Sequence, residues 1–337
     1  MSLNYIGSKA TLIPFIRETI YKTVGADLSQ KFFADLFAGT GIVARSFNDE
    51  CKCVIANDTE YYSYVLLKHY LHHNIKDEWY QELIDYLNHV DTTNYPNGFI
   101  FTHYCTGGGK GRNYFTNQNG LKIDAIRMRL NRMKKSDEPF FDVYYYYAGL
   151  ASLLEAADKV ANTASTYVSY LKHIKRTALK PIWLETLKVS GKPVNQVYNE
   201  DANRLIQNIE GDILYLDPPY NARQYGAYYH VLETIARYDD FIPKGVTGQR
   251  NYYRSKYCEK RDAEWALDAL LNNARFKYIF LSYNNEGIIP IDTIRKILSK
   301  YGKYDAVSTP HKRFKQDATR VERPDNTLEY IHILEKK

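Results

Sequence analysis

The sequence has little cysteine and no long apolar run. Its four cysteines, Cys51, Cys53, Cys105 and Cys258, are scattered and form no C-x-x-C pair, which excludes a disulfide framework and favours a reducing compartment. No apolar stretch approaches the roughly 20 residues that cross a bilayer, and the first residues, MSLNYIGSKATL, lack the apolar run of a signal peptide. We therefore expect a soluble, cytoplasmic protein that has no membrane partner.

The composition is that of an ordinary globular protein. A length of 337 residues predicts about two domains at roughly 150 residues each, and 45% hydrophobic with 25% charged residues excludes global disorder. Tyrosine is abundant, with 32 Tyr against 14 Phe, and its hydroxyls can meet water, phosphate or a base edge. Lys and Arg exceed Asp and Glu by 45 to 39, and this mild excess of +6 permits a nucleic acid partner without identifying one.

The first part of the chain alternates between strands and helices. Residues 31–37 have the pattern of a buried strand, 38–41 of a tight turn, and 42–48 of the start of a helix. A second strand is predicted over 51–57, and an amphipathic helix over 60–70. Because strands and helices follow one another in turn, the simplest architecture is a parallel sheet.

The strand pattern returns near the other end of the chain. Residues 211–220 form an apolar run that ends in a proline pair, and 276–287 form a second strand that ends in polar residues. The segment 327–334 is predicted to be a last, antiparallel strand. We therefore predict one α/β domain that is built from both ends of the chain and interrupted by an insertion.

The middle of the chain, residues 76–194, has helical periodicity and concentrated positive charge. Helices are predicted over 77–90 and from roughly 148 to 174, with a glycine-rich loop over 105–120 between them. The segment 102–140 carries eight Lys or Arg and three Asp or Glu, so its charge of +5 nearly equals that of the whole chain. This insertion is therefore the natural place for contacts with a polyanion.

A glycine turn and a carboxylate point to a cofactor. Gly39 and Gly41 lie between a predicted strand and helix, where glycine lets the backbone turn sharply and approach a ligand closely. With Ala44 the spacing also satisfies G-x-G-x-x-A, so a dinucleotide remains open. Asp58 ends the next predicted strand, where a carboxylate accepts hydrogen bonds from the ribose hydroxyls of an adenosine-containing cofactor. The two features predict a nucleoside cofactor without identifying it.

The tetrapeptide Asp217-Pro218-Pro219-Tyr220 follows the apolar strand 213–216, at the place where open α/β sheets have their ligand crevice. An exocyclic aryl amine is a poor nucleophile because its lone pair is delocalised into the ring. Acceptors on both N–H bonds and a stacked side chain draw it toward tetrahedral geometry. Asp217 and the Pro218 carbonyl are the predicted acceptors and Tyr220 the stacking group. As an acceptor, Asp217 needs no raised pKa.

Taken together, these motifs resemble the Dam-type class of adenine-specific DNA methyltransferases, which use S-adenosylmethionine and include many restriction-modification enzymes. The resemblance rests on Tyr5-Ile6-Gly7-Ser8-Lys9, the segment 35–41 (DLFAGTG), Asn57-Asp58, Asp217-Pro218-Pro219-Tyr220 and the strand end 282–287 (SYNNEG). Their order, with the cofactor motifs first and the catalytic tetrapeptide after a long insertion, is that of the class.

The resemblance implies a fold and a division into domains. The expected fold is a Rossmann-like methyltransferase sheet, mostly parallel with an antiparallel C-terminal strand, interrupted by a mainly helical insertion. Residues 1–75 and 195–337 would form the catalytic domain. Residues 76–194 would form an inserted helical, basic region that recognises the target.

The resemblance also implies roles for single residues, with S-adenosylmethionine as cofactor and no metal. Lys9 would lie near the methionine carboxylate, Asp58 would hold the ribose, and Asp201 would contact the adenine side of the cofactor. The implied cofactor-binding residues are Tyr5, Lys9, Asp35, Phe37, Gly39, Gly41, Asp58, Asp201 and Asp217, and the catalytic residues are Asp217, Pro218, Pro219 and Tyr220.

The implied substrate is double-stranded DNA, and the methyl group goes to the N6 amine of an adenine that is flipped out of the duplex. Flipping is required because a stacked and paired amine cannot reach a cofactor in a sheet crevice. Basic side chains would then contact phosphates and a few base edges. The predicted DNA contacts are Lys110, Arg112, Arg127, Arg129, Lys172, Lys175, Arg254 and Lys256.

Three alternatives remain open from the residues alone. The enzyme could methylate the exocyclic amine of cytosine in DNA, because the geometry required is similar, or it could act on adenine in RNA. From a different class, the chain could be a DNA-binding module with a degenerate cofactor site. We expect it to belong to a restriction-modification system or a related prokaryotic or phage DNA modification system. A cognate endonuclease would act in that system without direct contact.

Overall fold

The computed structural model describes residues 3, 5–72, 74–93, 98–134, 140, 142–312 and 326–337. The chain forms two compact units, which are described separately. The sheet unit contains Ile6–Thr59, Val194–Gln224 and Arg254–Lys337, and the helical unit contains Met1–Tyr5, Glu60–Pro193 and Tyr225–Tyr253. None of the helices in the described ranges is both long enough and apolar enough to span a membrane.

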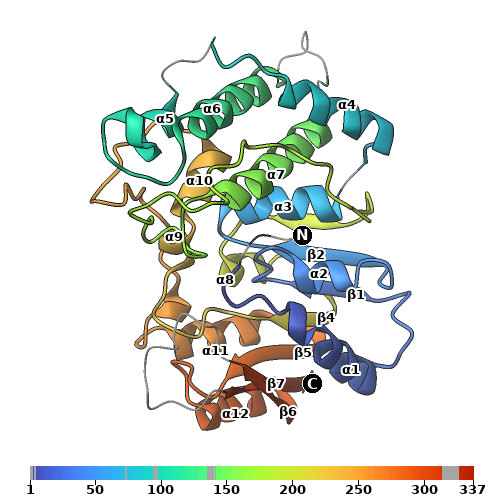
Figure 1. Ribbon diagram of the computed structural model, residues 1–337. Coiled ribbons are helices and arrows are strands. Elements are labelled where there is room, and N and C mark those ends of the chain that lie inside the picture. The colour runs from blue at the N-terminus through green and yellow to red at the C-terminus, as the bar shows by residue number, and fades with distance from the viewer. Residues whose placement is uncertain are drawn as a thin grey trace. The chain divides into compact units, whose positions relative to one another are not determined.

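The sheet unit contains seven strands in the order β3-β2-β1-β4-β5-β7-β6 (Figure 1). The strands are β1 (Phe32–Asp35), β2 (Cys53–Asn57), β3 (Gln196–Tyr198), β4 (Glu210–Leu216), β5 (Arg275–Asn284), β6 (Gly302–Lys312) and β7 (Asn326–Lys336). Neighbours from β3 to β5 are parallel, whereas β7 pairs antiparallel with both β5 and β6. The predicted parallel sheet and its antiparallel C-terminal strand are therefore confirmed. Strands β3 and β6 were not predicted.

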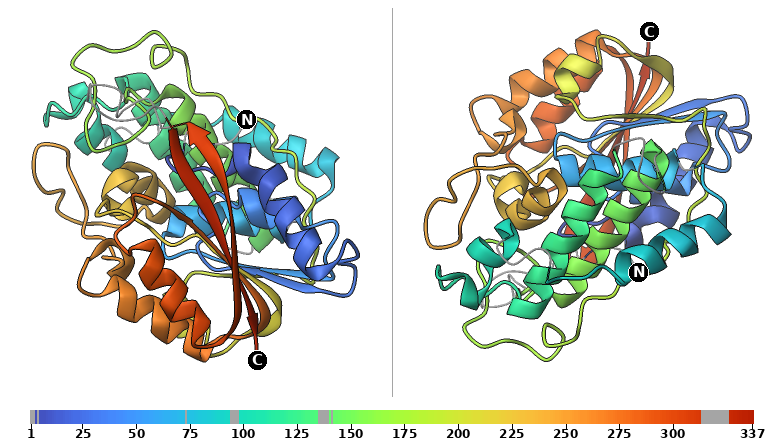
Figure 2. Two further views of the ribbon diagram at one scale, coloured as in Figure 1. Left: turned by 90° about the horizontal axis from the view of Figure 1, so that it is seen from below. Right: turned by 90° about the horizontal axis from the view of Figure 1, so that it is seen from above.

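Helices cover both faces of this sheet (Figure 2). The helices of the sheet unit are α1 (Ile13–Val24), α2 (Ile42–Ser46), α8 (Ala202–Leu205), α11 (Ala263–Asn273) and α12 (Ile291–Ser299). Apolar side chains of α8, α11 and α12 form one core with alternate residues of β1, β2, β4 and β5. At the other face, the ring of Phe33 from β1 stacks on Phe47, which ends α2, with 4.5 Å between centroids. Burial on both faces explains why these strands read as continuous apolar runs.

The helical unit has its own core. Its helices are α3 (Tyr61–Leu71), α4 (Asp77–Asn88), α5 (Phe99–Tyr104), α6 (Asn117–Arg132), α7 (Val143–Val160), α9 (Tyr225–Tyr228) and α10 (His230–Arg237). The helix predicted from 148 to 174 instead runs from Val143 to Val160. It begins where the Asp142 carboxylate caps the Tyr144 amide, and it stops before Asn162, whose side-chain amide donates to the carbonyls of Asn113 and Leu171.

The helical unit has different bounds from the predicted insertion at 76–194. Its longest segment begins at Glu60, and the unit also includes Met1–Tyr5 and Tyr225–Tyr253, of which the latter follows the Asp217 tetrapeptide in the sequence. The reason is packing, because side chains of α3 and α10 share one apolar core with α4, α6 and α7. Segments before and after the tetrapeptide therefore build the unit that sequence patterns assigned to one continuous insertion.

Candidate active site

The first part of the site is the turn between β1 and α2. Gly39 has φ 54° and Gly41 has φ 78°, a backbone region that residues with a Cβ rarely adopt. The turn is closed by a hydrogen bond of 2.7 Å from the Gly41 amide to the Ala38 carbonyl. The two glycines therefore let the chain reverse directly after a buried strand, as their spacing predicted.

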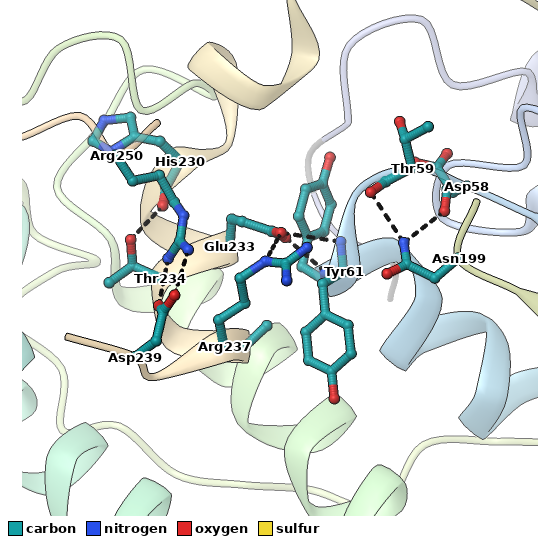
Figure 3. A network of polar contacts seen from close by, with 12 residues as sticks. Asp58, Thr59, Tyr61, Asn199, His230, Glu233, Thr234, Arg237, Asp239 and Arg250 are labelled. Carbon is teal, nitrogen blue, oxygen red and sulfur yellow. Dashed lines mark hydrogen bonds and ion pairs between the residues drawn. The ribbon is translucent and has the colours of Figure 1, made fainter. Parts of the chain in front are cut away.

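Asp58, directly after β2, is hydrogen-bonded to this turn. Its Oδ2 accepts a hydrogen bond of 2.8 Å from the Gly39 amide. The side-chain amide of Asn199 donates to the main-chain carbonyls of Asp58 and Thr59, at 2.8 and 3.0 Å, and fixes the strand end (Figure 3). The structure thus joins the glycine turn and the carboxylate that the sequence had connected only by spacing.

Asp35 ends β1 and is almost fully buried, with 1% of its surface exposed. Burial and the nearby charges of Asp217 and Asp58 raise the pKa of Asp35 well above its usual range, against the opposing effect of the Phe37 and Ala44 amides. Among the described residues, its Oδ1 has no hydrogen-bond partner. A buried carboxylate oxygen in this position is available to a donor group of a ligand.

The catalytic tetrapeptide meets the N-terminal motif at the end of β4. The ammonium Nζ of Lys9 lies 3.0 Å from Oδ1 of Asp217 and 5.1 Å from the ring centroid of Tyr220. Lys9 is only 4% exposed. The resemblance had implied that Lys9 lies near the methionine carboxylate of the cofactor, and here its nearest partner within the chain is Asp217, the predicted catalytic aspartate.

The surroundings of this ion pair shift the pKa values of both groups. Burial raises the pKa of Asp217 to about 6, although the charge of Lys9 opposes the shift. For Lys9, burial disfavours the ammonium, but Asp217, Tyr220 and Glu329 together raise its pKa well above the usual value. No sequence signal indicated the shift at Asp217, because the shift arises from the packing around the strand end.

Glu329 is a functional candidate that sequence reasoning missed. It lies on β7, is 4% exposed, and places Oε2 at 3.8 Å from the Lys9 ammonium. Burial raises the pKa of Glu329, and Lys9 opposes this. The available signal was a single carboxylate in the otherwise apolar stretch TLEYIHIL.

Contacts with the end of β5 hold the catalytic loop. The main-chain carbonyl of Tyr220 accepts a hydrogen bond of 2.9 Å from the Ile288 amide. The ring of Tyr220 packs edge-on against Tyr283 at 5.6 Å between centroids, and the Tyr283 hydroxyl accepts from the Ile289 amide at 3.1 Å. The strand end 282–287 therefore lies behind the tetrapeptide, as the resemblance implied.

Three further predicted cofactor residues have other partners within the chain. Tyr5 belongs to the helical unit and stacks on Tyr225 and Tyr229, at 5.5 and 4.9 Å between centroids. The Asp201 carboxylate caps α8 by accepting from the Arg204 amide at 3.1 Å. Phe37 packs edge-on against Tyr257 at 5.1 Å. Their roles toward a cofactor stay predictions.

Two of the predicted DNA contacts are structural. Arg127 is 1% exposed and donates to the carbonyls of Ile235 and Ala236 at 2.7 and 3.3 Å. Arg112 is 8% exposed and donates to the carbonyls of Val246, Gly245 and His103 at 3.1, 3.0 and 3.3 Å. The prediction that these guanidinium groups contact DNA disagrees with their geometry, because both are buried and satisfied by backbone acceptors.

The remaining predicted contacts differ in exposure. Arg129 is half-buried and donates to the Tyr86 hydroxyl, and Lys175 is half-buried and donates to the Thr163 carbonyl at 2.8 Å. The exposed members of the set are Lys110, Lys172, Arg254 and Lys256. The prediction of phosphate contact therefore rests on these four exposed residues.

Carboxylates follow or end three adjacent parallel strands, β1, β2 and β4, and a buried lysine pairs with the last of them. This sheet with its antiparallel final strands defines a Rossmann-like methyltransferase, and an aspartate at the end of β4 suits an amino group as acceptor. Residues 5–297 match the family model described as D12 class N6 adenine-specific DNA methyltransferase, and the chain belongs to this family.

Several characterised proteins resemble the chain along its length. It is 52% identical to the type II methyltransferase M.NlaIII of Neisseria lactamica, over 99% of both chains. It is 38% identical to the type II methyltransferase M.CviAII of Paramecium bursaria Chlorella virus 1, over 95% of this chain and 94% of that one. Its function is therefore N6 adenine methylation of DNA, and its relatives are type II modification enzymes. The family match favours adenine over cytosine and DNA over RNA.

Proposed function

We propose that the chain uses S-adenosylmethionine to methylate an adenine that is flipped out of double-stranded DNA, as the modification enzyme of a restriction-modification system. The observation that carries this proposal is the ion pair of Asp217 with Lys9 at the end of β4. In the pairing of β1 with β4, Asp35 is in register with Tyr215, two residues before Asp217. The glycine turn and the tetrapeptide therefore start from neighbouring strand ends.

The residues at these strand ends fit S-adenosylmethionine. The donors of this cofactor are the methionine ammonium, the adenine amine and two ribose hydroxyls, and the side chains that follow or end β1 and β2 carry carboxyl groups. Oδ1 of Asp35 is buried without a hydrogen-bond partner among the described residues, and the turn at Gly39 and Gly41 has no Cβ to obstruct a ligand. Asp58 would accept hydrogen bonds from the ribose hydroxyls. When bound, the cofactor supplies an electrophilic methyl group.

The tetrapeptide activates the target amine by accepting hydrogen bonds. The Asp217 carboxylate accepts from one N–H bond and the Pro218 carbonyl from the other, while the Tyr220 ring stacks on the base. At neutral pH Asp217 is ionised, because its pKa is about 6. Its charge stabilises the positive charge that develops on the amine nitrogen as the new bond forms. The hydrogen bond from Ile288 to the Tyr220 carbonyl keeps the loop in place.

The duplex itself is held by the exposed cations. Lys110, Lys172, Arg254 and Lys256 lie on the surface of the described residues and contact phosphates by charge. A cognate endonuclease would recognise the same sequence separately, since protection by methylation needs no contact between the two enzymes.

Replacement of Asp217 by alanine tests the proposal. We expect Asp217→Ala to lower the rate of methyl transfer about 10²- to 10³-fold, because the charged acceptor for the amine is lost. The assay uses DNA from a methylation-free host and maps the modified bases. The matched control is Glu210→Ala, which removes an exposed carboxylate from the opposite end of the same strand. A folded Asp217→Ala protein that still methylates adenine near the wild-type rate would contradict the proposal.

A further inference from the structure

The active site holds one more carboxylate than the chemistry above uses. Lys9 Nζ lies 3.0 Å from Asp217 and 3.8 Å from Glu329, so one buried ammonium serves two carboxylates. Glu329 comes from β7, whereas Asp217 follows β4 and Lys9 precedes the short helical turn Ala10–Leu12. The buried Glu329, the partly buried Asp217 and the buried Lys9 give this group a net negative charge when all three are ionised.

The nearer contact creates a conflict with catalysis. With Lys9 at 3.0 Å, Oδ1 of Asp217 is engaged, and the ammonium offsets the negative charge that the attacking amine requires. If Asp217 were its sole anion, moving the buried ammonium away would leave a buried charge unpaired, which is strongly unfavourable. A second carboxylate that is already within 4 Å removes this cost, because the ammonium exchanges one anion for another.

We propose that Glu329 is a positioning residue that takes over the Lys9 ammonium when the target amine binds, and so frees Asp217 to act as the acceptor. The inference rests on the role of Asp217 proposed above. It assigns the C-terminal strand β7 a part in the reaction, although this strand carries none of the family motifs. Loss of Glu329 would leave Lys9 attached to Asp217 in a neutral pair.

Other groups face the three ions without replacing Glu329. Tyr215 of β4 and Tyr220 of the tetrapeptide lie near Lys9. Burial and the charge of Lys9 lower the pKa of His311 of β6. Asn284 of β5 hydrogen-bonds to Glu329 and holds it in place. Asp35 of β1 faces Asp217, and burial raises the pKa of Asp35 well above its usual range. Glu329 is the group among these that forms the second ion pair with Lys9.

The proposal has a pH signature that a packing defect would not produce. The negative charge of Glu329 raises the pKa of Asp217, so its removal lowers that pKa. The rate of the wild-type enzyme should fall as the pH drops through about 6, where Asp217 takes up a proton. In Glu329→Gln the plateau rate at pH 8 falls, yet the acid limb moves to lower pH.

The experiment compares Glu329→Gln, the conservative Glu329→Asp, and Glu335→Gln as a matched control farther along β7. Single-turnover methylation of unmethylated DNA is measured from pH 5 to 9. The pKa of Asp217 is measured separately in the cofactor-free protein by carboxyl ¹³C NMR. We expect Glu329→Gln to slow methyl transfer about tenfold at pH 8 and to lower the pKa of Asp217. Glu329→Asp recovers part of the rate, and Glu335→Gln behaves like the wild type.

Two results would overturn the inference. One is a Glu329→Gln enzyme with the wild-type rate, and the other is a slow enzyme whose Asp217 pKa is unmoved and whose rate Glu329→Asp does not improve. If the circular dichroism spectrum shows that Glu329→Gln is unfolded, Glu329→Asp alone tests the proposal. A Glu329→Asp protein with the wild-type methylation rate and the wild-type pKa of Asp217 would then refute it. An active Glu329→Gln beside an inactive Asp217→Ala refutes only this inference. An active Asp217→Ala refutes the proposed function.

Discussion

Arg127 is predicted to stabilise the helical unit, and its replacement by methionine tests that role. Its buried guanidinium donates to the carbonyls of Ile235 and Ala236 in the last turn of α10, where a helix leaves carbonyls without partners. Methionine keeps an apolar stem but leaves both acceptors buried. Each such carbonyl costs about 1–3 kcal/mol, and the lost cation at the helix end costs about 0.3–1 kcal/mol. We expect Arg127→Met to lower the free energy of unfolding by about 3 kcal/mol.

Urea unfolding followed by circular dichroism at 222 nm measures this loss in the full chain. The control is Arg132→Met, an exposed position on the same helix, for which we expect a change within about 0.5 kcal/mol. DNA binding separates the structural role from the earlier interpretation. Well below the unfolding temperature, Arg127→Met should keep the wild-type slope of log affinity against log salt, whereas Lys172→Ala should reduce it by about 0.9. Wild-type stability together with a reduced slope for Arg127→Met would refute the reasoning.

Two further predictions concern Asp35 and Arg112. Because the pKa of Asp35 is raised, the folded state holds its proton to higher pH than the unfolded chain, so stability decreases as the pH rises above about 4. Asp35→Asn should therefore raise the melting temperature at pH 8 but not at pH 4, and thermal scans at the two pH values that show no difference would contradict this. Arg112→Met removes the hydrogen bonds to Gly245 and Val246, and should speed proteolytic cleavage within 239–250. Limited proteolysis with mass spectrometry measures the cleavage rate, and a rate equal to that of the wild type would show that the arginine does not hold this loop.

The parts of the site that sequence could predict are those with local signals. Gly39 and Gly41 follow one apolar strand and Asp58 follows the next, and a hydrogen bond from the Gly39 amide to the Asp58 carboxylate joins the two strand ends. Asp217 follows an apolar run whose composition predicts a buried strand. These residues are recognisable because the backbone conformation and the neighbouring sequence determine their position.

What could not be predicted depends on tertiary packing. Glu329 reaches Lys9 only because β7 inserts between β5 and β6, and no pattern near the C-terminus indicates that order. Arg112 and Arg127 contribute to a basic segment by count, yet both charges are buried against carbonyls from a distant segment. A charge total therefore overestimates the surface that is available to DNA.

The bonds from Arg112 to Gly245 and Val246 have a consequence for the exchange of segments between related enzymes. Donor and acceptors are separated in the chain by the catalytic strand β4 and its tetrapeptide, although they belong to one unit. Replacement of residues 76–194 alone would bring in a foreign sequence to face the host's 225–253 segment. It could leave the carbonyls of Gly245 and Val246 without their donor. A transplant of the helical unit therefore needs segments on both sides of the Asp217 tetrapeptide to be exchanged together. This unit should accordingly diverge more readily by single substitutions than by exchange of one block.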